Sequence, residues 1–119
     1  MDRVNQHYPE ERAVEKWGDG ESYCCSIVKQ ECAGLTDWYC GYVRFKHDLQ
    51  IDVDEVEVHG GVTFFERYDN GTVVYGFDCN HMGDSSDPEK SDLAWLHNEV
   101  ERMRASIEAL RKETADAIR

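Results

Sequence analysis

The chain has 119 residues and carries 25 Asp and Glu against 13 Lys and Arg, a formal net charge of −12 at pH 7. Hydrophobic residues make up 40% of it, and no apolar run approaches the length of a membrane span. Without such a run, the chain is not expected to enter a membrane. Because nucleic-acid affinity comes largely from Lys and Arg, a chain this acidic is also not expected to bind DNA or RNA directly.

The length suits one domain that covers residues 1–119, and 11% aromatic residues provide enough bulk for a core. The N-terminus lacks the apolar run of a secretory signal. The five cysteines are an odd number with no export signal, which favours reduced structural thiols over a disulfide scaffold. These features together predict a cytoplasmic protein.

The first twenty residues form a poorly defined N-terminal segment, in which Pro9–Trp17 is compatible with a short helix. Residues 23–29 and 38–45 follow and are rich in aromatic and β-branched side chains. Such residues suit a pleated surface, so we expect two paired antiparallel strands.

An acidic stretch spans residues 48–57 and contains no basic residue. Its carboxylates belong to Asp48, Asp52, Asp54, Glu55 and Glu57. One interpretation is solubility alone. The other is that these side chains bind a basic surface on a partner protein.

Two further strands are predicted at residues 62–68 and 72–78, on either side of Asn70-Gly71. Asn-Gly between two such runs is typical of a two-residue hairpin with a type I′ turn. Symmetric pairing about this turn would place Thr63 opposite Asp78 and bring His59 near Met82.

A helix is predicted for residues 91–118, with Ser91 able to cap its start. Its apolar residues repeat every three or four positions, which indicates one face packed on the sheet. At 1.5 Å per residue the helix is longer than the sheet is wide. A second interpretation is therefore that its last turns pair with a second copy of the chain in a homodimer. The predicted fold class is α+β, a small antiparallel sheet of about 4–5 strands in residues 22–78 against a long C-terminal helix.

The hairpin geometry would gather two polar, glycine-bearing segments at one corner. The candidate ligand-binding residues there are His59, Gly60, Gly61, Thr63, Asp78, His81 and Asp84. Imidazoles and carboxylates beside glycines can hold a small polar or phosphorylated ligand. The alternative is local turn and capping roles. Two His and two Asp could also bind a divalent metal, but no metal-motif spacing is present, so we predict no metal or cofactor.

The chain from about residue 36 to 110 resembles an uncharacterised family of short proteins of tailed phages and prophages. The resemblance is carried by His59-Gly60-Gly61 and by the pattern Gly-Phe-Asp-x-x-His-x-Gly-Asp over residues 76–84. It implies an accessory protein inside a prokaryotic host and brings no established activity. The charged N-terminus and Phe45-Lys46-His47 depart from the family pattern, which carries a proline-rich turn at the latter position.

The residues favour a binding protein over an enzyme, because no nucleophile and base pair and no phosphate loop is present. We therefore assign no catalytic residue. An anti-defence role could use either of two partners, a host defence protein met by the acidic surface or a small nucleotide-like ligand held at the His59 corner. A small metal-dependent hydrolase at the same corner is the third hypothesis.

Overall fold

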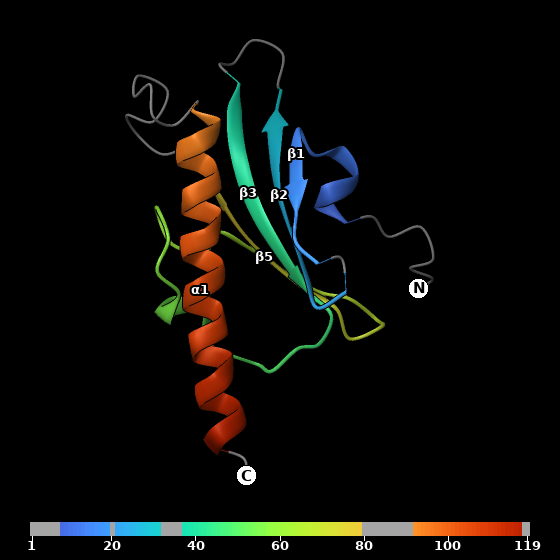
Figure 1. The fold of residues 1–119 in the computed structure, drawn as a ribbon, viewed down its shortest axis with the longest axis vertical. Helices are drawn as coiled ribbons and strands as arrows, with labels where there is room; N and C mark the ends of the chain where they lie inside the picture. Colours follow the sequence, from blue (N-terminus) through green and yellow to red (C-terminus); the bar gives the residue numbers. More distant parts are fainter. Residues whose placement is uncertain (1–7, 20, 32–36, 80–91, 118–119) are drawn as a thin grey trace.

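The structure is a computed structural model that describes residues 8–19, 21–31, 37–79 and 92–117. It has the predicted α+β architecture, a five-stranded antiparallel sheet with one long helix across it (Figure 1). In spatial order the strands are β1 (Glu15–Trp17), β2 (Tyr23–Gln30), β3 (Trp38–Phe45), β5 (Val73–Asp78) and β4 (Phe64–Arg67), and the helix is α1 (Leu93–Ala117). Of two short 3₁₀ helices, η1 (Pro9–Arg12) precedes β1, and η2 (Val53–Glu55) lies between β3 and β4.

The main core lies between α1 and one face of the sheet. Alternate residues of the three central strands point to α1, including Ile27, Val43 and Tyr75. They meet the predicted apolar face of α1, whose buried members are Leu96, Val100, Met103 and Ile107. The connection between β3 and β4 completes this layer beside α1, because Val56 and Val58 are buried in the same core.

The opposite face of the sheet is covered by the N-terminal segment. Tyr8 packs on Tyr68 with ring centroids 4.8 Å apart, and Glu10 accepts a 2.5 Å hydrogen bond from Arg44 of β3. The short helix expected over Pro9–Trp17 is wrong in its second half, because the residues after η1 extend into edge strand β1. The sheet therefore begins before residue 22, and Figure 1 shows η1 and α1 on opposite sides of it.

Trp17 connects the edge strand β1 to helix α1. Its indole N–H donates a 2.7 Å hydrogen bond to Glu101, and its ring stacks on His97 at 3.9 Å. Arg104 donates a second hydrogen bond of 2.6 Å to the same carboxylate. The hydrogen bond from Arg104, helped by that from Trp17, holds the pKa of Glu101 below its ordinary value of 4.5, although burial acts in the opposite direction.

We expect Glu101→Gln to destabilise the protein at neutral pH and to have little effect in acid. A carboxyl group whose pKa is lower in the folded state contributes stability above its unfolded pKa, and this contribution is lost as the pH falls through the folded value. Urea unfolding of both proteins at about pH 7 and about pH 3, followed by tryptophan fluorescence, measures the difference. A difference that persists undiminished in acid would contradict the proposed role of the Glu101 charge.

The hairpin between β4 and β5 forms as predicted, but its turn differs. Tyr68 N–H donates to Thr72 O at 2.8 Å, and Gly71 N–H donates to Tyr68 O at 3.0 Å, which leaves a three-residue loop. Gly71 has a φ of +90°, and Asn70 is not among the described residues with positive φ, so the type I′ turn is wrong. The side chain of Asn70 accepts from Thr72 N–H and donates to Tyr8, and these bonds fix the loop.

The residue that caps helix α1 is Asp92, one position after the predicted cap Ser91. Asp92 accepts a 2.9 Å hydrogen bond from Ala94 N–H, as an N-cap does, and Ser91 lies outside the described residues. In Figure 1 the last turns of α1 extend past the sheet. Pairing of two copies through these turns stays a prediction.

The four described cysteines are buried free thiols, namely Cys24, Cys25, Cys40 and Cys79. Cys24 and Cys25 point to opposite faces of β2, as predicted, since their neighbours on β3 are Arg44 and Val43. Burial raises the pKa of Cys25 far above the usual range. Burial also raises the pKa of the Cys24 and Cys40 thiols, which favours the protonated form of all three.

Candidate functional site

The predicted corner is divided between the two faces of the sheet. The ring of His59 lies against Trp95 of α1, with centroids 5.6 Å apart, and His59 N–H donates to Glu99 at 2.6 Å. Asp78 is paired with Cys40 of β3, and paired residues of neighbouring strands point to the same face. The side chain of Cys40 packs in a second hydrophobic cluster, with Tyr42 and Val74, on the face away from α1. His59 therefore lies on the helix side, while Asp78 points to the other side.

A one-residue change of register accounts for part of this separation. In β4 and β5, Phe64 lies opposite Gly76 and Arg67 opposite Val73, so paired residue numbers sum to 140. The two-residue turn predicts a sum of 141, because it contains one residue fewer. Thr63 N–H donates to Gly76 O at 2.9 Å, and the expected Thr63 and Asp78 pair is wrong.

Gly60 and Gly61 form the turn that follows Val58. Their φ angles are +70° and +79°, a region that non-glycine residues rarely adopt, and Gly61 N–H donates to Val58 O at 2.9 Å. This conformation agrees with the alternative in which Gly60 and Gly61 serve a turn and not a ligand. His81 and Asp84 lie outside the described residues, so ligand binding by the predicted set stays a prediction.

The acidic stretch forms a ridge on the connection beside α1. Asp52, Asp54, Glu55 and Glu57 are exposed, and we call these four residues the acidic ridge. Asp48, the fifth predicted residue, is different, because its side chain is 10% exposed and pairs with Arg67. Four of the five residues predicted to bind a partner are therefore exposed in this segment.

The backbone of the acidic ridge is held in place. Asp52 caps η2 by accepting from Asp54 N–H at 3.0 Å, and Glu57 N–H donates to the hydroxyl of Ser106 at 3.0 Å. The buried Val56 and Val58 fix the segment on both sides of Glu57. The ridge therefore presents its charges with little conformational freedom left to lose on binding.

An open groove of about 540 Å³ runs between the acidic ridge and α1. Glu55 and Glu57 line it on one side, and Arg102, Ala105, Ser106, Ala109 and Leu110 line it on the helix side. In such a groove, the small apolar side chains can contact the methylene stem of a Lys or Arg side chain of a partner. The carboxylates can then contact its charged end. The groove extends the acidic ridge with a surface that can bury a basic side chain.

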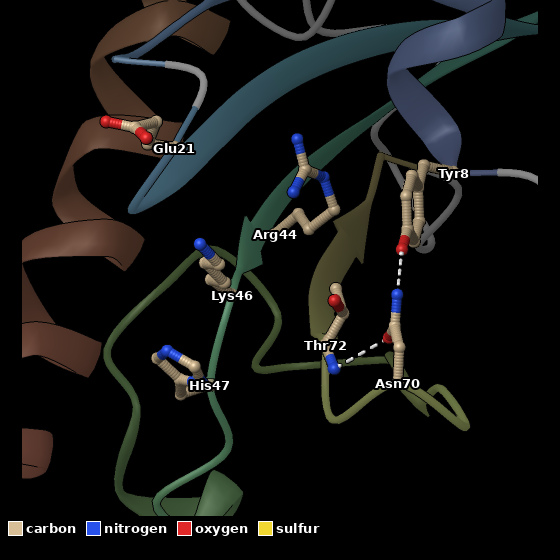
Figure 2. A pocket seen from close by; sticks show the side chains of 7 residues that line it. All are labelled: Tyr8, Glu21, Arg44, Lys46, His47, Asn70 and Thr72. Carbon is tan, nitrogen blue, oxygen red and sulfur yellow. Dashed lines mark hydrogen bonds between the residues drawn. The ribbon is translucent and has the colours of Figure 1, made fainter.

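A second cavity, of about 400 Å³, lies where β3 leaves the sheet (Figure 2). It is lined by Tyr8, Glu21, Arg44, Lys46, His47, Asn70 and Thr72. The sequence interpretation missed it, because its side chains come from four separated segments. The basic side chains of Arg44, Lys46 and His47, close together in the chain, were the available signal.

Among the residues that the structure describes, no three His, Cys, Asp or Glu side chains are grouped to hold a metal ion. The metal-dependent alternative therefore depends on His81 and Asp84. In the same part of the chain, no helix is both long and apolar enough to cross a membrane. Comparison with known proteins found no match to this chain, whether among family models, curated proteins or solved structures.

Proposed function

We propose that this protein is a non-catalytic binding protein that docks its acidic ridge against a Lys- and Arg-rich surface of a partner protein. The resemblance to short phage proteins suggests the partner, a host defence protein inside a prokaryotic cell that the bound protein blocks. The net charge of −12 supports attraction to a basic partner over any nucleic acid.

The observation that carries this proposal is that, within the described residues, the ridge carboxylates have no basic side chain as an ion-pair partner. Other carboxylates of the described residues do form ion pairs, as Glu10 does with Arg44 and Glu99 with Arg102. Within the described residues, no Lys or Arg lies within ion-pair distance of Asp52, Asp54, Glu55 or Glu57. Four uncompensated charges on a fixed backbone repel one another, and a basic partner would relieve that repulsion.

Sequestration of a nucleotide at the His59 corner has less support. His59 is engaged by Trp95 and Glu99 on the helix side, whereas Asp78 faces the other side of the sheet. A ligand that contacts both would have to reach around the edge of the sheet. The acidic ridge needs no such rearrangement.

The double variant Asp54→Asn/Glu57→Gln tests the proposal. We expect it to lose about tenfold in affinity for the partner, since each removed charge weakens a charge-assisted contact. The matched control is Glu113→Gln/Asp116→Asn, which removes the same charges from exposed positions of α1. Proteins retained by each tagged variant in the host are identified by mass spectrometry, and the purified partner is then titrated.

Salt and infection assays provide two independent readouts. Binding through the acidic ridge should weaken steeply as ionic strength rises from about 0.1 M to about 1 M, because the Debye length falls from about 10 Å to about 3 Å. Expression of the wild type, but not of the ridge variant, should restore infection in cells that carry the targeted defence. Equal partner affinity and equal restoration by the ridge variant and the control would refute the proposal.

A further inference from the structure

The cavity in Figure 2 collects basic and hydroxyl side chains in a strongly acidic protein. Arg44 of β3 and the following Lys46 and His47 line one side, and Thr72 and Tyr8 line the other. A neighbouring cavity of about 270 Å³ shares Glu21, Lys46 and His47 with it and adds Ser22 and, from α1, Arg111. The two cavities therefore meet at Lys46 and His47, with the carboxylate of Glu21 beside them.

The walls are fixed by contacts that leave the interior open. The guanidinium of Arg44 lies 4.8 Å from the centroid of the Tyr8 ring and is hydrogen bonded to Glu10. The Arg111 guanidinium lies 4.4 Å from the Phe45 ring centroid, and it donates a 2.6 Å hydrogen bond to the carbonyl of His47. Preorganised walls lower the entropic cost of binding a ligand.

Two of the cations have no carboxylate partner. Among the described residues, neither Lys46 nor Arg111 forms an ion pair, in contrast to Arg44, Arg67 and Arg104. Of the described side chains that line the two cavities, only Glu21 is acidic. Two uncompensated cations beside an imidazole create a local preference for an anion despite the net charge, because screening limits the reach of the distant carboxylates.

We propose that these joined cavities bind a small phosphorylated molecule. Its phosphate would lie where the cavities meet and accept hydrogen bonds from Lys46, His47 and Arg111, while the hydroxyls of Tyr8 and Thr72 contact the organic part. A phosphate has oxygens enough for several donors at once. A nucleic acid is disfavoured, since the cavity of about 400 Å³ has the size of a small-molecule site and the rest of the surface repels a polyanion.

Titration of the full chain with inorganic phosphate and with glycerol phosphate tests this site. We expect glycerol phosphate to bind with a dissociation constant of about 1 mM and inorganic phosphate to bind more weakly, both by calorimetry at constant ionic strength in chloride. Chloride alone should produce no saturable signal. Absence of saturable binding, or equal affinity for the two phosphates, would overturn the proposal of a phosphorylated organic ligand.

Three variants localise the binding. Lys46→Gln should weaken the affinity for glycerol phosphate about tenfold, and Lys112→Gln, an exposed lysine of α1 outside both cavities, should leave it unchanged. Glu21→Gln should strengthen binding, because it removes the one acidic side chain among the described residues of the walls. Thermal melts show whether each variant is folded, and equal effects of the two lysine substitutions would place the binding elsewhere.

This site is independent of the acidic ridge. Asp54→Asn/Glu57→Gln should bind glycerol phosphate as the wild type does, while Lys46→Gln should still bind the basic partner. The two proposals can therefore fail separately, and the two variants show which of them has failed. Loss of phosphate binding in the ridge variant would contradict the assignment to the joined cavities.

Discussion

Gly41→Ala is expected to lower the free energy of unfolding by about 2–3 kcal/mol, because it overpacks the contact between β3 and α1. A Cβ atom at Gly41 would lie 2.4 Å from the Phe77 ring and 2.6 Å from a methyl group of Val100. Both neighbours are fully buried, so neither can move away without displacing other core atoms. Equilibrium urea denaturation measures the loss.

A double-mutant cycle with Val100→Ala identifies the cause. Val100→Ala removes one of the two clashing groups, so it should cost less in the Gly41→Ala background, with a coupling energy of about 1 kcal/mol. Gly76→Ala is the matched control, because its Cβ would meet the Tyr42 ring at 2.6 Å on the opposite face. If Gly76→Ala and Gly41→Ala couple equally to Val100→Ala, the clash with α1 is not the cause.

Glu99→Ala is expected to cost about 2 kcal/mol, because it removes an acceptor from a partly buried N–H group. The Glu99 side chain, 11% exposed, accepts from His59 N–H at 2.6 Å and from Arg102 at 2.8 Å. His59 follows the last residue of the acidic ridge, Glu57, by two positions in the same connection between β3 and β4. The substitution should therefore also speed amide hydrogen exchange at His59.

Glu99→Gln separates the two contacts of Glu99. Its amide oxygen can still accept from His59 N–H, and only the charge opposite the exposed Arg102 is lost. We expect a cost below about 1 kcal/mol, the range of exposed ion pairs. Equal losses for Glu99→Gln and Glu99→Ala in urea denaturation would show that the charge, not the hydrogen bond to His59, holds the connection.

The candidate sites were predictable from the sequence only in part. The acidic ridge was visible because its residues are neighbours in the chain, but the pairing of Asp48 with Arg67 was not. The cavity at Lys46 was missed, since Arg44 and Thr72 come together only when β3 and β5 pair. The His59 corner was expected from a hairpin register that one extra loop residue changes.

Local chemistry was enough to determine four of the five strands and the long helix in the described residues. β-branched and aromatic runs specified four of the strands, Asn70-Gly71 specified a reversal between β4 and β5, and the spacing of apolar residues specified the buried face of α1. Tertiary structure alone decided the hairpin register, the strand β1 at Glu15–Trp17 and the sides on which His59 and Asp78 lie. These depend on contacts between distant residues, such as Trp17 with Glu101 and Asn70 with Tyr8, whose energies no local pattern encodes.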